Sequence, residues 1–447
     1  MKKSFIITNA RIVNEGHLMN GSVVIRGERI DTVLGISDPL PGNLEILDAG
    51  GKLLIPGVID CHVHFREPGL TYKGDLASES RAAVAGGITS FFEMPNTQPP
   101  TTTLQLLEEK CRLASEKSLA NYSFFLGASN DNIEEIANAD PYLVCGVKVF
   151  FGASTGNMLV DNISALEEIF RRSPIPVTAH CEDEAVIRAN SNQLHDEYGD
   201  DVPIEMHPLI RSAEACYKSS ELAVKLARKY KTRLHIAHLS TVRELDLLDA
   251  PLPLKDKQIT AETCIHYLWF CDEDYARLGT RIKVNPAIKS RSDRSGLFQG
   301  LIDGRLDILA TDHAPHLLSE KENTYFKAPS GTPLVQHSLP AMLEFWKQDR
   351  ISLEMVVEKM CHAPAECYKI EKRGFIRPGY FADLVLVDPE KSWTVSRANI
   401  QSKCGWSAFE GTTFHSSITH TFVNGNLVFG NGNFTDTVNG KRITFSR

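Results

Sequence analysis

Two histidines separated by a single residue lie in the segment of the chain with the clearest chemical potential, Asp60-Cys61-His62-Val63-His64. The apolar run before them predicts a β-strand, and successive side chains of a strand alternate between its two faces. His62 and His64 therefore point the same way. Two imidazoles this close repel each other when both are protonated, whereas neutral rings can share a divalent cation. The spacing indicates a metal site, although two polar residues at a strand end would look the same.

Four further polar residues stand within or directly after apolar, strand-like segments, namely Lys148, His180, His238 and Asp312. Taken singly, each would be interpreted as a core or capping residue. Together with the two histidines above, they fall on the first, fourth, fifth, sixth and eighth of the expected strands. The catalytic groups of β/α-barrel enzymes gather at the C-terminal ends of the barrel strands. This joint placement favours one active site built from all of these side chains.

Lys148 needs an explanation of its own, because it lies inside the apolar strand 144–150. An ammonium group beside metal ions is strongly disfavoured, and a buried lysine tends to lose its proton. The neutral amine can then react with carbon dioxide to give a carbamate, whose two oxygens can bridge two metal ions. The alternative is an ordinary lysine whose ammonium group reaches solvent or an acid.

Eight apolar segments alternate with amphipathic helices through the middle of the chain, which predicts a (β/α)₈ TIM-like barrel and an α/β fold class. A doubly wound open sheet is the alternative, but no G-x-G-x-x-G follows the first strand. The expected strands are 53–62, 88–94, 122–127, 144–150, 176–180, 233–239, 258–264 and 307–311, and the clearest expected helices are 77–85, 104–117, 165–171, 212–229 and 292–301.

Both ends of the chain contain short β-branched segments with turn residues between them. Strands are expected at 5–7, 10–13, 21–26 and 29–34, and again at 382–388 and in a hairpin over 418–429 that turns at Asn424-Gly425. The two ends most simply combine into one small β-sandwich domain beside the barrel. We therefore expect residues 1–54 and 371–447 to form this domain and residues 55–370 to form the metal-dependent hydrolase barrel.

The composition is ordinary for a globular enzyme, with 42% hydrophobic residues, 23% charged residues and a net charge of −8 over 447 residues. The negative charge argues against nucleic-acid or membrane partners. The apolar run Phe5-Ile6-Ile7 is too short for a signal peptide. The ten cysteines contain no C-x-x-C pair, so reduced thiols in a cytoplasmic protein are the simplest expectation.

Over nearly its whole length the sequence resembles the amidohydrolase superfamily, including residues 374–384, which look like the usual return into the small β domain. Three motifs resemble those of dihydroorotases: His62-Val63-His64-Phe65-Arg66-Glu67-Pro68-Gly69, Met94-Pro95-Asn96-Thr97 and Thr311-Asp312-His313-Ala314-Pro315-His316. The resemblance implies a cyclic amide hydrolase that interconverts (S)-dihydroorotate and N-carbamoyl-L-aspartate in de novo pyrimidine biosynthesis.

The resemblance also implies how metal and substrate are held. The H-x-H pair and Asp312 would contact one zinc ion, His180 and His238 would bind a second, and carboxylated Lys148 would bridge the two. Asp312 would also act as the base and then the acid of the reaction. Arg66, Asn96 and Asn285 would hold the substrate carboxylate. His316 would lie against the substrate ring.

Two points of the sequence bear on competing functions. Dihydropyrimidinases, hydantoinases and allantoinases share the metal set but need no clamp for a ring carboxylate, so Arg66 and Asn96 favour an anionic substrate. After Asn285, the residues Ala287-Ile288-Lys289 depart from the proline, leucine and arginine expected of a dihydroorotase.

An inactive homologue acting as a partner subunit would typically have lost metal ligands, and this chain retains them. A homodimer and an association with a transcarbamoylase are left open.

Other polar residues are expected to have lesser roles. Asp60 is expected to be a hydrogen-bond acceptor behind the ligands. His195 and His207 lie in a polar stretch and predict a surface loop over the barrel mouth. The polar segment 317–331 directly follows the site and fits either a mobile lid or a plain surface loop.

Overall fold

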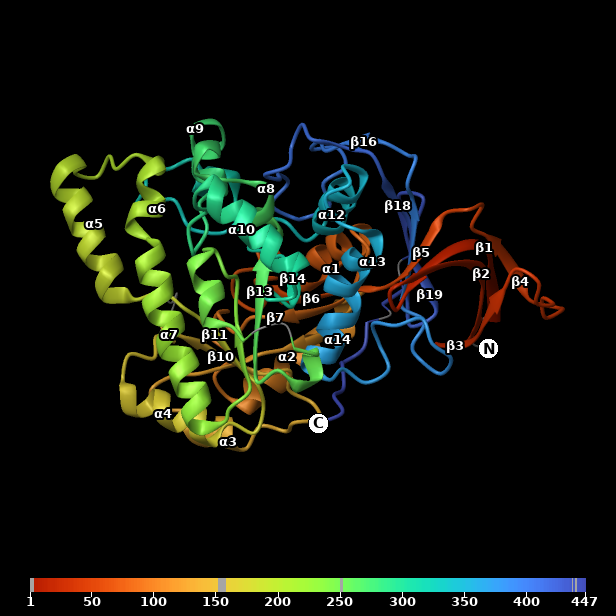
Figure 1. Ribbon diagram of the computed structural model, residues 1–447, viewed down its shortest axis with the longest axis horizontal. Helices are drawn as coiled ribbons and strands as arrows, with labels where there is room; N and C mark the ends of the chain where they lie inside the picture. Colours follow the sequence, from red (N-terminus) through yellow and green to blue (C-terminus); the bar gives the residue numbers. More distant parts are fainter. Residues whose placement is uncertain (1–3, 152–157, 250–251, 436, 439) are drawn as a thin grey trace.

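Parallel strands form a closed barrel in the middle of the chain, as the sequence predicts (Figure 1). The computed structural model describes residues 4–151, 158–249, 252–435, 437–438 and 440–447. The barrel strands of this part of the chain are β6 (Val58–Val63), β7 (Ile88–Glu93), β8 (Asn121–Phe124), β9 (Leu126–Gly127), β10 (Val147–Phe150), β11 (Val177–His180), β12 (Leu234–Ile236), β13 (Ile259–Cys264) and β14 (Ile308–Ala310).

Hydrogen bonds between the first and last strands close the barrel. Strands β6 to β8 form one parallel group and β9 to β14 another. β8 and β9 together occupy one position, because only Phe125 separates them and its N–H donates to Glu93 O at 3.0 Å. On the other side, His64 N–H donates to His313 O at 2.7 Å, which joins β6 to the segment after β14. Residues far apart in the sequence are thereby brought to one rim.

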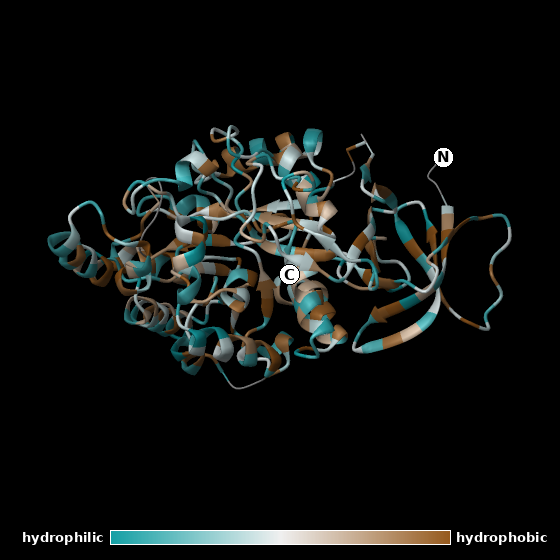
Figure 2. Cartoon of the chain, turned by 90° about the horizontal axis from the view of Figure 1, so that it is seen from above, coloured by the Kyte–Doolittle hydropathy of each residue, from teal (hydrophilic) through white to brown (hydrophobic). Residues whose placement is uncertain are grey.

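Helices cover the outside of the barrel and bury one apolar side each. In α4, for example, Leu166, Ile169 and Phe170 are buried, and the Asn162 side chain caps the first turn by accepting from Ser164 N–H at 2.9 Å. The interior strands are largely hydrophobic and the outer helices more hydrophilic (Figure 2). The helices are α1 (Leu76–Ala85), α2 (Leu104–Lys117), α3 (Ile133–Ala137), α4 (Ile163–Arg172), α5 (Glu184–Tyr198), α6 (His207–Ile210), α7 (Ala213–Tyr230), α8 (Ile265–Trp269), α9 (Tyr275–Leu278), α10 (Arg291–Ile302), α11 (Leu318–Lys321), α12 (Ser338–Lys347), α13 (Leu353–Val357) and α14 (Ala363–Tyr368).

The first expected barrel strand, 53–62, is two strands that belong to different sheets. β5 (Leu53–Pro56) belongs to the sheet of the β-rich domain described below, and β6 begins the barrel two residues later. Pro56 lacks the N–H that a continuous ladder requires, and a Cβ at Gly57 would lie 2.1 Å from Thr89 Oγ1. The chain therefore changes sheets at this point, which the unbroken apolar run conceals.

Strands from both ends of the chain combine into one β-rich domain beside the barrel, as expected (Figure 1). Its sheet has the order β20-β19-β18-β15-β5-β1-β2-β3, and β4 pairs with β1. The expected strands 5–7 and 10–13 are one strand with an irregularity between Ile7 and Ala10. The remaining bounds are β1 (Ser4–Asn14), β2 (His17–Arg26), β3 (Arg29–Gly35), β4 (Glu45–Asp48), β15 (Leu384–Asp388), β18 (Ser417–Val423), β19 (Asn426–Gly430) and β20 (Asn433–Phe434), with a separate pair β16 (Trp393–Thr394) and β17 (Thr413–Phe414).

Residues 441–447 cover the end of the barrel where the strands begin. Ile443 and Phe445 are buried in a cluster with Phe92, Phe125 and Tyr368. Ile443 N–H donates to Tyr122 O at 2.9 Å, next to the start of β8. The opposite end, where the strands finish, carries the polar residues described below. Within the described residues, no helix combines the length and apolar character needed to cross a bilayer.

Candidate active site

All the site residues expected from the sequence line one cavity of about 200 Å³ at the C-terminal ends of the barrel strands. Lys148 lies within β10 and His180 is the last residue of β11. His238 and Asp312 each follow the end of a strand, β12 and β14 respectively, by two residues. The full set is His62, His64, Arg66, Asn96, Lys148, His180, His238, Asn285, Asp312 and His316.

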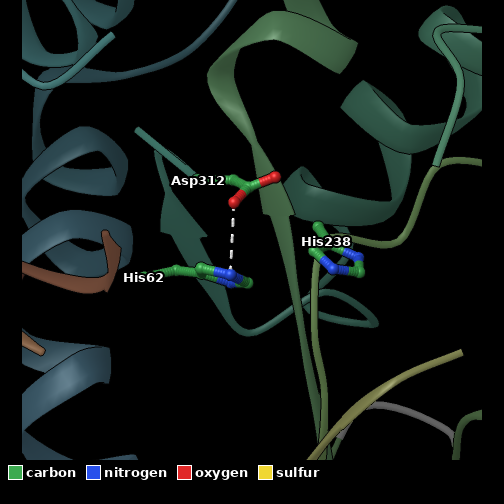
Figure 3. Close-up of side chains that lie close together, drawn as sticks. All are labelled: His62, His238 and Asp312. Carbon is green, nitrogen blue, oxygen red and sulfur yellow. Dashed lines mark ion pairs between the residues drawn. The ribbon is translucent and has the colours of Figure 1, made fainter. Parts of the chain in front are cut away.

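The closest group of metal-binding side chains is His62, His238 and Asp312, whose ligand atoms all lie within 4.8 Å of one another (Figure 3). Asp312 Oδ1 lies 3.3 Å from His62 Nε2 and 3.0 Å from His64 Nε2. His180 Nδ1 lies 2.8 Å from His238 Nε2, which connects the second pair of histidines to the first. This group draws one residue from each expected zinc-binding pair, together with Asp312.

Two observations show that these side chains fit metal ions. Among the described residues, Lys148 Nζ is a buried atom without a hydrogen-bond partner, and so is Nδ1 of His238. Burial lowers the pKa of His64 to about 4 and holds the pKa values of His180 and His238 below their ordinary range. Neutral imidazoles that meet nitrogen to nitrogen present the lone pairs that a cation requires.

Lys148 has the environment that the carbamate hypothesis requires. Its side chain is fully buried, and this burial lowers its pKa to about 8. An amine with such a pKa is neutral often enough at physiological pH to act as a nucleophile. The carboxylates of Glu262 and Asp312 raise the pKa of Lys148, but the effect of burial is larger.

Asp312 remains ionised despite its burial. Burial raises the pKa of its carboxyl group, but the nearby His62 and His64 more than offset this, so that the pKa lies well below its ordinary value. The backbone of Asp312 has a φ of 50°, and His238 and Arg66 have φ values of 39° and 71°. Non-glycine residues with positive φ are uncommon and concentrate at functional sites. Here the surrounding structure imposes this geometry on three residues of one cavity.

Glu262 supports the ligands from behind, and the sequence analysis did not identify it. Its Oε1 lies 2.5 Å from His62 Nδ1 and accepts from His238 N–H at 3.2 Å, while Oε2 lies 3.1 Å from His235 Nε2. The contact on Nδ1 directs Nε2 of His62 toward Asp312. The available signal was an acidic residue inside the fully buried strand β13. His235 does not line the cavity, and its two ring nitrogens contact Thr260 and Glu262.

Glu182 and Asp60 hold other parts of the site. Glu182 accepts from Arg211 and lies 2.9 Å from His180 Nε2, so it orients this ring as Glu262 orients His62. Asp60 accepts from Thr311 Oγ1 at 2.6 Å and from His62 N–H at 3.2 Å. The prediction that Asp60 is a hydrogen-bond acceptor behind the ligands is confirmed. Its bonds also tie β6 to Thr311, the residue that follows β14.

The predicted substrate residues form a polar group on one side of the cavity. Arg66 Nε donates to Pro315 O at 3.1 Å, and its Nη2 lies 3.0 Å from His316 Nε2. Asn96 Oδ1 lies 2.7 Å from His64 Nδ1. Asn285 Oδ1 accepts from Ser330 Oγ at 2.9 Å. The structure places Asn285 in the cavity despite the departure of the residues that follow it.

The segment 317–331 contributes Pro329, Ser330 and Gly331 to the cavity lining, and the sequence analysis named none of them as site residues. Lys321 is fully buried, and its Nζ donates to Pro329 O at 2.7 Å, Gly331 O at 2.8 Å and Lys283 O at 3.0 Å. The Lys321 side chain thus ties both ends of the segment to Lys283, which precedes Asn285 by two residues.

The interpretation of His195 and His207 as surface-loop residues needs correction for each. His195 is exposed, as expected, but it lies in helix α5 and not in a loop. His207 is fully buried, with Nδ1 2.8 Å from Tyr325 Oη and Nε2 2.7 Å from Val284 O. The polar sequence around His207 conceals Ile210, which packs with the distant Tyr325 in a small buried cluster there.

Comparisons with known proteins agree with this architecture. The chain matches the amidohydrolase family over residues 53–428. It is 32% identical over 440 residues to the dihydroorotase of Halobacterium salinarum, with 97% of this chain and 99% of that protein covered. It is 33% identical over 417 residues to the dihydroorotase of Methanosarcina acetivorans, with 91% and 88% covered.

Solved structures show the same fold. The L-hydantoinase (dihydropyrimidinase) from Arthrobacter aurescens superposes with a TM-score of 0.93 at 26% identity, covering 99% of this chain and all of that one. A dihydropyrimidinase from Brevibacillus agri superposes with a TM-score of 0.89 at 23% identity, with 99% and 100% covered. These likenesses confirm a TIM barrel with a β-rich domain.

Proposed function

The chain belongs to the amidohydrolase family, and from this premise we propose that it is a dihydroorotase, catalysing the reversible hydrolysis of (S)-dihydroorotate to N-carbamoyl-L-aspartate in pyrimidine biosynthesis. The observation that carries the proposal is the position of Arg66 in the cavity that holds the histidines, Lys148 and Asp312. A guanidinium group is suited to a carboxylate, and dihydroorotate differs from dihydrouracil by one ring carboxylate.

In the proposed enzyme, the four histidines and Asp312 would hold two zinc ions. When bound, such ions polarise the ring amide carbonyl and lower the pKa of the attacking water. The neutral Lys148 amine would add to the carbon of carbon dioxide and release one proton, which gives a carbamate that contributes two oxygen ligands. The buried and unpartnered Nζ supports this assignment.

Asp312 moves the proton of the reaction. Because its carboxylate stays ionised, it can accept a proton from the attacking water on Oδ1 or Oδ2. The same carboxyl group then returns that proton to the ring nitrogen as the amide C–N bond breaks. In the reverse direction it accepts the proton from the carbamoyl nitrogen as the ring closes.

Arg66 recognises the ring carboxylate in this proposal, with Asn96 and Asn285 beside it. The contact of Asn96 Oδ1 with His64 turns the carbonyl side of that amide toward the metal-binding residues. His316 lies next to Arg66 on the same side of the cavity.

A second candidate is the hydrolysis of a neutral ring, favoured by the likeness to L-hydantoinase. The test is to measure hydrolysis of dihydroorotate, dihydrouracil, hydantoin and allantoin by the wild type and by Arg66→Met. Loss of a charge-assisted hydrogen bond of about 1.5–3 kcal/mol should lower kcat/KM for dihydroorotate by about tenfold or more. Activity on dihydrouracil should change much less, because that ring has no carboxylate.

Other outcomes would replace the proposal. A wild type that prefers dihydrouracil, hydantoin or allantoin would establish the second candidate. Equal losses on all substrates would make Arg66 structural. A chain that binds no metal and turns over none of the four rings would be an inactive homologue, against which the retained ligands argue.

A further inference from the structure

His316 presents only one edge of its imidazole to the substrate cavity. On this edge, Nε2 lies 3.0 Å from Ser330 O and 3.0 Å from Arg66 Nη2, and both of these residues line the cavity. On the other edge, Nδ1 lies 2.9 Å from Lys73 Nζ. Lys73 is almost completely buried and is not among the residues that line the cavity.

The contacts of His316 determine which ring nitrogen carries the proton. A lysine ammonium group has three N–H donors and no acceptor, which favours a lone pair on His316 Nδ1. Arg66 Nη2 is also only a donor and favours a lone pair on Nε2, whereas the Ser330 carbonyl can only accept and decides for the proton on Nε2. The proton of the neutral ring then lies on Nε2, where it can be donated to Ser330 O. The opposite tautomer would set an N–H against the ammonium group and a lone pair against the Ser330 carbonyl.

A carboxylate keeps Lys73 in this position. Glu320 Oε1 forms an ion pair with Lys73 Nζ at 3.0 Å and accepts from Tyr72 Oη at 3.1 Å. Glu320 Oε2 lies 3.7 Å from His316 Nδ1 and accepts from Leu317 N–H. If the ammonium group were removed, this carboxylate would be the nearest acceptor for a proton on Nδ1, and the other tautomer would be favoured.

We propose that Lys73 is a positioning residue that fixes His316 as its Nε2–H tautomer and so keeps the ring from turning a lone pair toward the anion-binding side of the cavity. That the anion is the ring carboxylate of dihydroorotate rests on the proposed function. In this tautomer His316 does not accept from Arg66, which leaves Arg66 Nη2 directed to the substrate. In the other tautomer, Nε2 would draw that N–H to itself and turn a lone pair toward the carboxylate.

The neutrality of the ring makes its tautomer matter. Burial, together with Arg66 and Lys73, holds the pKa of His316 well below its ordinary value. The backbone of His316 is also fixed, because Trp406 Nε1 donates to His316 O at 2.7 Å. A change of tautomer therefore exchanges a donor for an acceptor without moving the ring.

The first measurement is an ¹⁵N spectrum of the histidine-labelled, metal-loaded protein, in which long-range proton couplings identify the protonated ring nitrogen. The His316 signals are assigned from their loss in His316→Gln. The wild type should show the Nε2–H tautomer and Lys73→Met the Nδ1–H tautomer. Lys73→Arg should restore Nε2–H, because a guanidinium group also only donates.

The second measurement is kinetic. KM for dihydroorotate should rise about tenfold in Lys73→Met, as for loss of one charge-assisted hydrogen bond, with a smaller change in kcat. Lys73→Arg should recover most of this loss. The matched control is Lys403→Met. Lys403 is half-exposed, forms an ion pair with Asp75 at 2.8 Å and donates to Thr71 O, two residues before Lys73. It is therefore a lysine near Lys73 that does not contact His316.

Several results would overturn the inference. A wild type with the proton on Nδ1 contradicts it directly, even if Lys73→Met fails to fold. An unchanged tautomer in a folded Lys73→Met also contradicts it, and so does an equal rise of KM in Lys403→Met, which would indicate a general charge effect. If the wild type does not act on dihydroorotate, the proposed function fails, while the spectrum still decides the role of Lys73.

Discussion

At the scale of single residues, the site combines a fully bonded supporting carboxylate with an unpartnered lysine. Glu262 contacts the side chains of His62 and His235 and the backbone of His238, whereas Lys148 Nζ makes no hydrogen bond to any described residue. Unsatisfied polar atoms are costly to bury, so natural proteins keep them where chemistry requires them. This contrast supports the proposed modification of Lys148.

Replacement of Lys148 by alanine should remove the bridging group and most of the bound metal. The wild type is expected to hold about two zinc ions per chain, as in other two-metal sites. Metal analysis and intact mass measured under native conditions test this, because the wild type should be heavier by one carbon dioxide. Lys110→Met is a matched control, since Lys110 is also fully buried but pairs with Glu93 at 3.3 Å. A fully active Lys148→Ala enzyme with normal metal content would contradict the prediction.

Replacement of Asp312 by asparagine should abolish the proton transfer while preserving the shape of the side chain. We expect a loss of about 10²–10⁴-fold in both hydrolysis and ring closure, as is typical of general acid–base catalysis. Metal content must be measured on the same samples, because Asp312 is also a candidate ligand. Normal rates in both directions with full metal occupancy would remove Asp312 from the mechanism.

At the scale of elements, the segment 317–331 is held by hydrogen bonds from two buried lysines in addition to the apolar cluster around Tyr325. Lys321 Nζ satisfies three backbone carbonyls, and Lys283 Nζ satisfies two more, those of Tyr325 at 2.6 Å and Ala328 at 2.7 Å. Of the two interpretations open from the sequence, these contacts favour a fixed wall of the cavity over a lid that opens in each turnover.

Lys321→Met should release this wall. Methionine fills a similar volume but donates no hydrogen bond, and each carbonyl left unsatisfied costs about 1–3 kcal/mol. Hydrogen exchange should accelerate in peptides covering 317–331 and not in those covering α1, and KM for the substrate should rise. Lys327→Met is the control, because Lys327 is an exposed lysine of the same segment. Equal exchange in both variants would show that the segment is held by other contacts.

Elements also show what the sequence could and could not predict. The barrel strands and the ligands at their ends follow from apolar runs that finish in His or Asp, because this pattern is local. Glu262 and Lys73 escaped prediction, because their partners His62 and His316 lie 200 and 243 residues away. The change of sheet at Pro56-Gly57 was missed because both strands are fully buried and share one composition.

At the scale of the whole molecule, the site residues and the C-terminal segment 441–447 lie at opposite ends of the barrel. The ligands lie where the strands finish, and residues 441–447 cover the end where they begin. The domain boundaries expected from the sequence, 1–54, 55–370 and 371–447, stay a prediction, and this covering segment contacts the barrel although it falls in the last of them. The C-terminal part of the chain therefore has a role in the barrel as well as in the β-rich sheet.

Deletion of residues 441–447 should destabilise the barrel without altering the cavity. Burial of Ile443 and Phe445 contributes about 1.5–3 kcal/mol each, and both side chains are almost fully buried. Phe445 N–H also donates to Tyr142 O at 3.0 Å, and Ser446 N–H to Lys369 O at 2.8 Å, so their carbonyl partners would lose a donor. Thermal unfolding should therefore shift to a lower temperature.

The separation of the two ends makes the same deletion a test of their independence. Well below the unfolding temperature, the deleted protein should retain its metal content and the KM of the wild type, because the ligands lie at the far ends of the strands. Phe445→Ala should reproduce much of the loss of stability, and Lys441→Ala, whose side chain forms only an exposed ion pair with Glu28, should not. If metal is lost before the barrel unfolds, the two ends are coupled through the strands, and the segment supports the site as well as the fold.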